Sequence, residues 1–294
     1  MSAPSSRSAT KPAPLPAFRF GGAVAVVTGA AGGMGEQLAY GLALRGTHLV
    51  LVDRDAERLA AVAGTLARRR PEIHVRTFVA DLADAEAVRR LAADILAVEP
   101  VLNLLINNAG VALAGTFEET SAEEFDWVLA VNFAAPVALT RALLPRLRES
   151  ADSHVVNVSS LFGLIAPPGQ SAYSASKFAL RGFTEALRHE LAGEVGVTSV
   201  HPGGIKTRIA LDARVAAAAD QERSAQAMRA FNKVLTYPAD RAAARILESV
   251  RRRRGRVLVG MSARIPDVLA RVFPVTYWDR FVRLTAVSGR SGRR

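Results

Sequence analysis

The chain of 294 residues contains no cysteine. This absence excludes disulfide bonds, thiolate catalysis and zinc–thiolate sites, and it is typical of a cytoplasmic protein. Histidine is also scarce, and the five histidines form no cluster with metal-ligand spacing, so we expect no bound metal. No apolar run approaches the roughly 20 residues that span a bilayer. The sequence therefore predicts a soluble protein without a transmembrane segment.

The N-terminal segment, residues 1–18, lacks the apolar core of a secretory signal. Its Ser, Pro and Ala residues predict a disordered lead-in. The basic tail from about residue 286 is expected to be flexible as well.

Acidic residues are outnumbered, with 27 Asp and Glu against 38 Lys and Arg, which gives a formal charge of +11. A basic chain invites a nucleic-acid partner. The arginine clusters, however, are confined to 68–70, 251–256 and the C-terminus, and no aromatic residues are interleaved with them. Two of the clusters lie where helices are expected to end, and the helix dipole favours cations there. We therefore expect no nucleic-acid partner.

Short runs rich in Val, Ile and Leu recur along the chain, at 23–29, 47–53, 73–81, 101–110, 153–160, 195–203 and 255–260. Between them lie segments with helical periodicity, such as 57–70 and 85–98. Strands that are apolar on both faces and alternate with helices indicate a parallel sheet covered on both sides. The predicted fold is α/β, a single doubly wound Rossmann domain over 19–262 with about seven parallel strands and helices on both faces.

One segment, 205–237, interrupts this alternation. It is Ala-rich and charged, and it is predicted to be helical, as a lid beside the active site would be. Residues 263–294 form a C-terminal extension.

The stretch "TGAAGGMG", residues 28–35, follows the first predicted strand and begins a helix. Glycine at 29, 33 and 35 lets a turn close and lets the backbone approach a pyrophosphate at the helix N-terminus. The alternative is a purely structural turn.

Asp53 ends the second predicted strand, 18 residues beyond Gly35. A carboxylate there accepts hydrogen bonds from both ribose hydroxyls of an adenosine and repels a 2′-phosphate. Its alternative role is to cap the helix that begins near Asp55. The neighbouring Arg54 could bind such a phosphate, but position 32 is Gly rather than a basic residue. We expect NAD, with NADP as the alternative.

Two further strand ends carry polar signals. Asp81, followed by Leu82, closes the third strand and is placed for an adenine amino group. The "NNAG" stretch at 107–110 ends the fourth strand, where small residues permit close approach of a cofactor. Either could be a simple turn signal.

Tyr173 and Lys177 lie four residues apart in "SAYSASKFALRGFTEAL", residues 171–187, and so share one helical face. A free phenol has a pKa about three units too high for proton exchange near neutrality, and lowering it that far takes roughly 4 kcal/mol. A partly desolvated ammonium and a nearby nicotinamide cation could together supply that stabilisation. The alternative is a surface pair on a helix.

Asn132 lies in a predicted helix, four residues before Pro136. Proline has no N–H to donate to the Asn132 carbonyl, so that carbonyl is freed and a kink is expected. The alternative is a buried asparagine satisfied by backbone groups.

Taken in order, T-G-x-x-x-G-x-G at 28–35, N-N-A-G at 107–110, Asn132, Ser160, Y-x-x-x-K at 173–177 and "HPGGIKT" at 201–207 resemble the short-chain dehydrogenase/reductase family, in its ordinary-length Rossmann-fold form. The resemblance covers roughly residues 20–260. It implies an NAD(P)-dependent oxidoreductase that interconverts an alcohol and a carbonyl.

The resemblance also implies roles for single residues. Tyr173 would be the general acid and base, Lys177 would lower its pKa, and Ser160 would hold the substrate oxygen. Asn132 would hold a water linked to the lysine, and Ser159 would be structural, because the family spacing favours the second serine. His201 precedes a proline and is expected to be a packing residue rather than a catalyst.

The cofactor-binding residues that the resemblance implies come from the strand ends and the turns after them. They are Gly29, Ala31, Gly32, Gly33, Met34, Gly35, Asp53, Arg54, Asp81, Leu82, Asn108, Ala109, Gly110, Val131, Tyr173, Lys177, Pro202, Gly203, Ile205 and Thr207. Of these, the backbone of Ile205 and the hydroxyl of Thr207 would hold the nicotinamide carboxamide.

The alternative function is a non-catalytic NAD(P)-binding, redox-sensing protein on the same fold. The sequence retains Asn132, Ser160, Tyr173 and Lys177. This favours an active enzyme, because a protein that no longer catalyses the reaction would not need to keep these residues.

The substrate is expected to be a hydrophobic alcohol or ketone, because the residues predicted to line its pocket are apolar. They are Leu161, Phe162, Leu164, Ile165, Pro167 and Pro168, with Ile205, Ile209, Leu211, Met228 and Phe231 from the lid. The alternative is that several of these side chains pack on the sheet.

The C-terminal extension carries apolar and aromatic residues among arginines: Leu269, Val272, Phe273, Tyr277, Trp278 and Phe281. It could pack on the domain, complete a subunit contact or lie on a membrane surface as a peripheral amphipathic segment. We favour packing or a subunit contact, and the resemblance implies a homodimer or homotetramer.

Overall fold

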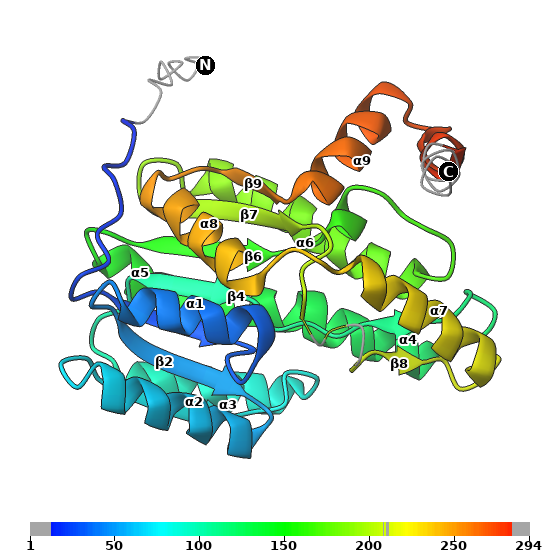
Figure 1. Cartoon of the computed structure of the whole chain (residues 1–294). Helices are drawn as coiled ribbons and strands as arrows, with labels where there is room; N and C mark the ends of the chain where they lie inside the picture. Colours follow the sequence, from blue (N-terminus) through cyan, green and yellow to red (C-terminus); the bar gives the residue numbers. More distant parts are fainter. Residues whose placement is uncertain (1–12, 208, 210–211, 284–294) are drawn as a thin grey trace, which may run out of the picture.

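The computed structural model describes residues 13–207, 209 and 212–283. Its centre is a seven-stranded parallel sheet with the strand order β3-β2-β1-β4-β6-β7-β9 (Figure 1). The strands are β1 (Val24–Thr28), β2 (His48–Asp53), β3 (Val75–Val79), β4 (Leu104–Asn107), β6 (His154–Val158), β7 (Gly196–Pro202) and β9 (Arg256–Val259). Each lies within one of the seven apolar runs of the sequence, so the predicted doubly wound α/β fold is confirmed.

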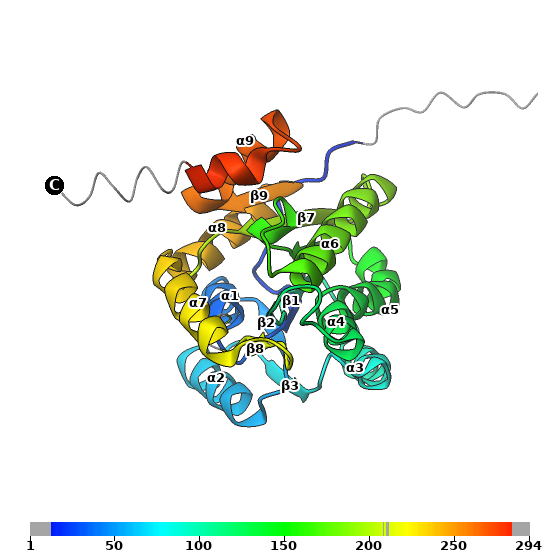
Figure 2. The ribbon, with the colours of Figure 1, turned by 90° about the vertical axis from the view of Figure 1, so that its right-hand side faces the viewer.

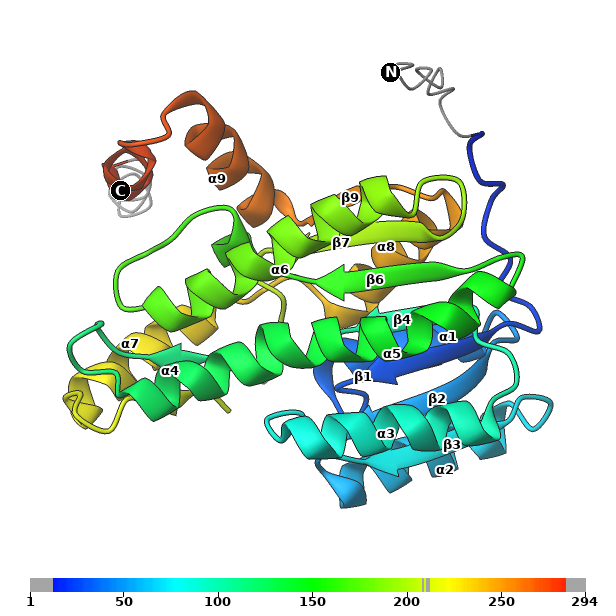
Figure 3. The ribbon, with the colours of Figure 1, turned by 180° about the vertical axis from the view of Figure 1, so that it is seen from behind.

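Helices cover both faces of the sheet. On one face lie α1 (Gly33–Ala43), α2 (Ala56–Arg69) and α8 (Ala239–Arg251), and on the other α3 (Ala85–Val98), α5 (Ala135–Glu149) and α6 (Ser171–Glu190), as Figures 1 and 3 show. Successive residues of β1 and β2 point to opposite faces and enter two separate apolar cores. Alternate residues such as Val27 and Leu51 face α1, whereas Val26 and Val50 face α3.

The strand order reverses beside β1, which pairs with β2 on one side and with β4 on the other. In sheets of this kind, ligands bind at the carboxyl ends of the strands on either side of the reversal. The glycine turn follows β1 and the "NNAG" stretch follows β4, so both motifs lie at that crevice.

The helix that contains Asn132 has three parts: α4 (Ala122–Leu129), a π-helical turn η1 (Ala130–Ala134), and α5. The N–H of Ala135 donates to the Ala130 carbonyl, five residues back. The adjustment expected before Pro136 therefore takes the form of a π-helical turn.

By length and composition this stretch, Ala122–Glu149, could cross a membrane, with a mean hydropathy of 1.6 over its most apolar window. The sequence analysis expected no such run, and the finding differs from that expectation. In the fold, Leu139, Leu143 and Leu147 pack in the core beside α3, which accounts for the apolar composition.

The N-terminal segment enters the core earlier than expected. Phe18, assigned above to the disordered lead-in, is 2% exposed, and its N–H donates to the Arg251 carbonyl at 3.0 Å. Its ring stacks edge-on against Phe20. Residues 1–12, and the tail from residue 284, lie outside the described residues.

The segment 205–237 contains β8 (Arg214–Val215) and α7 (Gln221–Val234) (Figure 2). β8 pairs with β5 (Leu113–Ala114) in a small second sheet that the sequence did not predict. The Arg214 guanidinium lies 3.9 Å from the centre of the Trp127 ring. The segment is therefore attached to α4 and to the strand that follows "NNAG".

After β9 the chain continues into α9 (Met261–Val272), and residues 277–283 are helical again. In Figure 1 the strand arrows point toward the side of the molecule on which α7 and α9 lie. A short 3₁₀ turn, η2 (Leu161–Gly163), follows β6 at the same end of the sheet.

Candidate active site

The turn between β1 and α1 depends on glycine. Gly29 and Gly33 have φ values of +68° and +56°, in the left-handed region. A Cβ on Gly35 would lie 1.9 Å from the Gly29 carbonyl oxygen, so no side chain fits between helix and strand. A Cβ on Gly32 would meet no described atom within 4 Å, and no described side chain caps α1. The first-turn N–H groups can therefore face a phosphate, and this turn fits the pyrophosphate of a dinucleotide.

Thr28 joins the glycine turn to the "NNAG" stretch. Its Oγ1 accepts hydrogen bonds from the N–H groups of Asn108 and Ala109, each at 3.0 Å. The Asn108 side chain in turn donates to the Thr28 carbonyl at 2.9 Å. A Cβ on Gly29 would lie 2.9 Å from the Ala109 Cα. The two predicted cofactor segments are therefore in direct contact.

Asp53 braces the same turn. Its Oδ2 accepts from the Ala31 N–H at 2.9 Å and its Oδ1 from the Asp55 N–H at 3.1 Å. The cap of α2 is Asp55, which accepts from the Arg58 N–H, so Asp53 does not fill that alternative role. Asp53 is half-buried beside the glycine turn, whereas Arg54 is exposed.

The other predicted contacts for the adenosine half are distributed along the same edge. Asp81 is exposed after β3, and its Oδ1 accepts from the Ala83 N–H at 2.9 Å. Leu82 and Val131 are buried. Met34 packs against the apolar core beneath α1.

Tyr173 and Lys177 both point into the protein, being 8% and 2% exposed. The Lys177 ammonium nitrogen lies 5.8 Å from the centre of the Tyr173 ring and donates to the Val158 carbonyl at 3.1 Å. The side chain of Ser160, just beyond β6, lies near enough to the Tyr173 phenol to lower its pKa, and its Oγ accepts from the Phe162 N–H at 3.1 Å. The pair is therefore not a surface pair, and three of the four predicted catalytic side chains lie together.

Burial raises the pKa of the Tyr173 phenol, and the nearby Ser160 side chain opposes that rise. Burial also lowers the pKa of the Lys177 ammonium to about 8. The sequence led us to expect a lowered tyrosine pKa. In the protein without a cofactor the pKa of Tyr173 is raised instead, because loss of solvent outweighs the favourable interaction with Ser160. The expected lowering included the nicotinamide cation and stays a prediction for the cofactor complex.

Asn132 is fully buried in η1 and clasps the backbone of Val111: its Oδ1 accepts from the Val111 N–H at 2.8 Å and its Nδ2 donates to the Val111 carbonyl at 2.9 Å. This corresponds to the alternative in which backbone groups satisfy the amide. A Cβ on Gly110 would lie 3.2 Å from both Asn132 Oδ1 and Lys177 Nζ. Gly110 therefore allows the backbone after β4 to lie against the lysine.

Ser176 is a contact that sequence reasoning missed. Its Oγ accepts from Asn132 Nδ2 at 3.1 Å and donates to the Tyr173 carbonyl at 2.7 Å. It thereby links the π-helical turn to the helix that carries the tyrosine. Its position three residues after Tyr173, on a buried helix face, was the available signal.

The "HPGGIKT" segment divides between the groove and the interior. Thr207 lies against the glycine turn, because a Cβ on Gly33 would be 3.3 Å from the Thr207 Cβ. Pro202 ends β7, and Ile205 is buried in the core. Gly203 instead meets the first turn of α9, because a Cβ there would lie 2.2 Å from the Ser262 Oγ.

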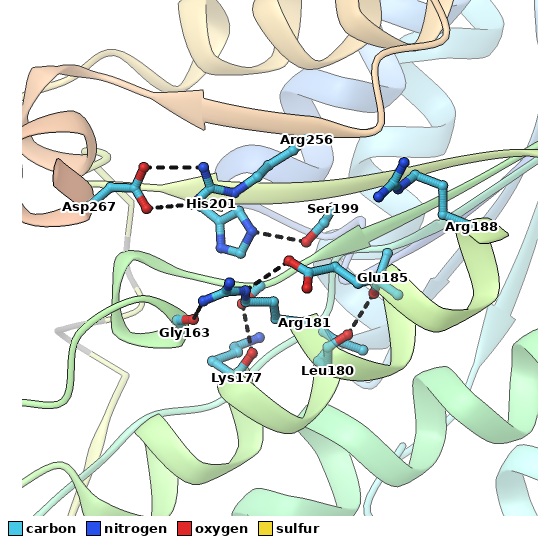
Figure 4. Close-up of polar contacts among 12 residues, drawn as sticks. Gly163, Lys177, Leu180, Arg181, Glu185, Arg188, Ser199, His201, Arg256 and Asp267 are labelled. Carbon is cyan, nitrogen blue, oxygen red and sulfur yellow. Dashed lines mark hydrogen bonds and ion pairs between the residues drawn. The ribbon is translucent and has the colours of Figure 1, made fainter. Parts of the chain in front are cut away.

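His201 is buried and contacts the backbone of Ser160. Its Nδ1 lies 3.1 Å from the Ser160 carbonyl oxygen. Its Nε2 lies 3.0 Å from the Ser199 Oγ (Figure 4). Because a carbonyl oxygen only accepts, Nδ1 carries the proton and Nε2 accepts from the serine hydroxyl. Burial lowers the pKa of His201 to about 4, so the ring is neutral near pH 7. The sequence analysis interpreted this residue as packing only. Ser159 meets its structural expectation, donating to the Lys177 carbonyl at 2.9 Å.

The predicted pocket lining is only partly available to a substrate. The Phe162 ring lies edge-on to the Tyr173 ring, with 6.0 Å between their centres. Leu164 and Ile165 are buried in the fold instead. Leu211 and the side chain of Phe231 lie outside the described residues. Within the described part of the chain, no group of three or more His, Asp or Glu side chains could hold a metal ion.

The chain matches the family model for short chain dehydrogenases over residues 23–218. A Mycobacterium tuberculosis protein with the provisional name oxidoreductase SadH is 40% identical over 261 residues, which cover 88% of this chain and 93% of the relative. A Xenopus laevis protein named dehydrogenase/reductase SDR family member 7B is 42% identical over 196 residues, covering 65% of this chain and 61% of the relative.

Two solved structures share the fold. A short chain dehydrogenase/reductase from Burkholderia phymatum, in complex with NAD, superposes with a TM-score of 0.77 at 32% identity, covering 90% of this chain and 96% of that one. A short-chain dehydrogenase from Sphingobium yanoikuyae, in complex with NADPH, gives 0.71 at 26% identity, covering 92% and 96%. With the family match, the relatives and the shared fold in agreement, the chain belongs to the short-chain dehydrogenase/reductase family of oxidoreductases, which act on CH–OH groups.

Proposed function

We propose that the chain is an NAD(P)-dependent oxidoreductase that interconverts a hydrophobic alcohol and its carbonyl compound, with Tyr173 as the general acid and base. The observation that carries this proposal is the contact between Ser160 and Tyr173 beside the buried ammonium of Lys177. The glycine turn and "NNAG", which meet at Thr28, complete the site.

The substrate oxygen would bind between the Ser160 hydroxyl and the Tyr173 phenol. During oxidation Tyr173 takes the hydroxyl proton, and during reduction it returns a proton to the carbonyl oxygen. Ser160 donates a hydrogen bond to the same oxygen. A bound nicotinamide cofactor supplies the hydride acceptor or donor.

Lys177 is proposed to stabilise the phenolate. Its ammonium has three N–H donors, and one of them is directed to the Val158 carbonyl. The remaining donors are free to bind the hydroxyls of the nicotinamide ribose. Its positive charge opposes the effect of burial on the pKa of Tyr173.

Asn132 is proposed to position the backbone around the water path next to Lys177. Its side-chain amide is not proposed to bind the water directly. The amide is already hydrogen-bonded to Val111 and Ser176. Through Gly110, it keeps the backbone after β4 close to the Lys177 ammonium.

We propose NAD as the preferred cofactor. Asp53 presents a half-buried carboxylate beside the glycine turn, where a 2′-phosphate would be repelled. Gly32 supplies no cation at the position before Gly33. Ala31, Gly32, Met34 and Arg54 are proposed to surround the adenosine phosphates, with Asp81 and Leu82 near the base.

The hydrophobic substrate class is supported by the side chains around the tyrosine. Phe162 contacts the Tyr173 ring, and Leu161 is partly exposed beside it. Met228 on α7 and Ile209 are also partly exposed. The segment 205–237 is proposed to act as the lid over this apolar lining.

The compartment and assembly are proposed to be those expected from the sequence, a cytoplasmic homodimer or homotetramer. Sedimentation equilibrium would give the mass directly, and a monomer would contradict the assembly.

The function is tested by a substrate panel followed at the absorbance of reduced nicotinamide, with NAD and NADP in parallel. We expect hydrophobic secondary and primary alcohols to be oxidised and sugar alcohols to be poor substrates. Activity confined to sugars would overturn the substrate class, and no activity on any alcohol or ketone would overturn the enzyme.

A further inference from the structure

The outward face of α9 is apolar. Met261, Ile265, Val268 and Val272 follow one another at spacings of four, three and four residues, and so lie on one side of the helix. Their exposed fractions are 62%, 51%, 58% and 60%, and Val275 beyond the helix is 89% exposed. We call these five side chains the apolar ridge. A large apolar face of this kind on a soluble domain marks an interaction site.

The opposite side of α9 is fixed to the domain. Ala263 and Pro266 are buried, and Asp267 forms an ion pair with Arg256 on β9 (Figure 4). The Tyr277 hydroxyl, beyond α9, accepts from the Ala166 N–H at 3.0 Å. The ridge therefore faces away from the sheet, on a helix that projects from the body of the protein (Figure 2).

Arginines from α8, β9 and α9 and from the turn before β9 line a cavity beside α9, which we call the arginine flank. This cavity of about 230 Å³ is lined by Arg245, Arg254, Arg256 and Arg264, together with Val257 and Leu258 of β9. Arg256 is paired with Asp267, whereas no ion pair joins Arg254 or Arg264 to another described residue. No carboxylate lines this cavity, so it is a cationic pocket beside the apolar ridge.

We propose that the apolar ridge and this arginine-lined cavity dock the protein on a lipid bilayer that carries anionic headgroups. The ridge would enter the headgroup and acyl boundary, while the arginines bind lipid phosphates. An amphipathic segment flanked by cations is suited to such a surface, and the charge of +11 on the whole chain adds long-range attraction.

Charge complementarity favours the bilayer over a second copy of the chain. In a two-fold contact built on the ridge, the arginine flanks of both copies would face each other. The only acidic residue between 261 and 275 is Asp267, which already pairs with Arg256. Just beyond the ridge Asp279 is exposed, but arginines stand at 264, 271, 280 and 283. A second copy would therefore bring more positive than negative charge to the flank, whereas anionic headgroups neutralise it.

The remainder of the chain fits the same partner. Residues 284–294 contain Arg290, Arg293 and Arg294 and no acidic residue. Their composition, with few large apolar residues, suits an anionic surface better than it suits burial of the ridge.

The contact of Tyr277 with Ala166 connects the proposed membrane-docking surface to the proposed substrate pocket. This step rests on the proposed function. Ala166 lies in the loop that follows Leu164 and Ile165, close to the Phe162 that contacts Tyr173. Docking would bring the entrance of the proposed substrate pocket to the membrane in which hydrophobic alcohols and ketones dissolve.

The test is co-sedimentation of the full-length protein with vesicles of phosphatidylcholine alone and with 30% phosphatidylglycerol. We expect binding to the anionic vesicles, at least tenfold weaker binding to the neutral ones, and release by high salt. The double variant Ile265→Glu/Val268→Glu should lose at least tenfold in affinity. Arg254→Gln/Arg264→Gln should weaken binding to anionic vesicles only. Leu44→Glu, at a residue 71% exposed at the end of α1, is the matched control and should bind as the wild type does.

Sedimentation equilibrium and circular dichroism of each variant accompany the assay. Absence of wild-type binding, or unchanged binding by a folded ridge variant, overturns the proposal. The proposal is also overturned if the wild type does not bind vesicles and a ridge variant has a lower oligomeric mass than the wild type. That result would assign the ridge to a subunit contact. If the Ile265→Glu/Val268→Glu variant is misfolded, the folded single variants Val272→Glu and Val275→Glu decide by the same criterion. Vesicle binding is measured without turnover, so its failure is distinct from a failure of the proposed enzyme.

Discussion

The ammonium nitrogen of Lys177 lies 5.8 Å from the centre of the Tyr173 ring, and both side chains are buried. No described carboxylate forms an ion pair with this lysine, whose Nζ donates to the Val158 carbonyl. A buried cation without a carboxylate costs folding free energy. The buried Lys177 ammonium therefore lowers the free energy of unfolding, but it is placed to stabilise a Tyr173 phenolate.

The cost can be measured with Lys177→Met. The pKa of Lys177 falls from 10.5 to about 8 on folding, so the penalty is fully present below pH 8 and disappears as pH rises to 10.5. We expect the variant to be more stable than the wild type at pH 7, by up to about 3 kcal/mol at 1.4 kcal/mol per pKa unit, and to lose most activity. Urea denaturation at pH 7 and at pH 10 measures the difference, with the exposed Lys206→Met as control. We expect the gain in free energy of unfolding over the wild type to be larger at pH 7 than at pH 10. A larger gain at pH 10 would contradict the inferred sign.

Asp53 is expected to set the cofactor preference. Asp53→Asn keeps a carbonyl oxygen to accept from the Ala31 N–H but removes the negative charge. The ratio of kcat/KM for NAD to that for NADP should fall at least tenfold, mainly through the KM values. Asp55→Asn, which changes the helix cap instead, is the control. Equal ratios in Asp53→Asn and the wild type would remove the carboxylate from cofactor selection.

His201 is expected to be a positioning residue for Ser160. Its Nδ1–H donates to the Ser160 carbonyl, so it orients the backbone that presents the serine hydroxyl. His201→Leu should lower kcat about tenfold to a hundredfold with little change in the KM for the cofactor, as positioning neighbours commonly do. His201→Asn retains a donor and should restore most of kcat. If the asparagine and leucine variants are equally impaired while both are folded, the hydrogen bond is not the reason.

His154 is expected to make the fold sensitive to acid. Its Nδ1 accepts from the Arg253 guanidinium at 3.0 Å, and its Nε2 lies 2.7 Å from the Thr198 hydroxyl, which itself donates to the Arg254 backbone carbonyl. Burial and the nearby guanidinium lower the pKa of His154 from 6.5 to about 3. Below pH 6.5 the unfolded chain therefore binds a proton that the folded protein rejects, and stability falls as pH decreases toward 3.

Urea denaturation at pH 7 and pH 4.5 measures this effect. Between pH 7 and pH 4.5 the free energy of unfolding of the wild type should fall by roughly 2 to 3 kcal/mol more than that of His154→Gln. The difference corresponds to about two pH units, from 6.5 to 4.5. An identical loss in both proteins would show that His154 protonates in the folded state. His189→Gln, at an exposed residue, should behave as the wild type does.

The fold was largely predictable because its strands are buried on both faces and its helices on one. Strands such as β1 and β2 are continuous apolar runs, and α3 has the bounds that its periodicity predicts. The strands β5 and β8 have two residues each, too few for any periodic signal. Phe18 was misassigned because the composition of the preceding segment, rather than its single aromatic anchor, determined the expectation.

The candidate site was predictable as a set of residues but not as an electrostatic environment. The i, i+4 spacing of Tyr173 and Lys177 fixes their common face, whereas their near-complete burial depends on β6, η1 and the loop after β4. In the protein without a cofactor, that burial raises the pKa of Tyr173, opposite to the expected direction. The contacts of His201 and Ser176 likewise join segments that are distant in sequence, and no local pattern predicts them.

The most direct test of the account is the Tyr173→Phe variant, measured for alcohol oxidation and for NADH binding by fluorescence titration. We expect turnover to fall at least a thousandfold, because the proton donor and acceptor is lost, while the dissociation constant for NADH changes less than threefold. Turnover within tenfold of the wild type would contradict the assignment of Tyr173 as the general acid and base.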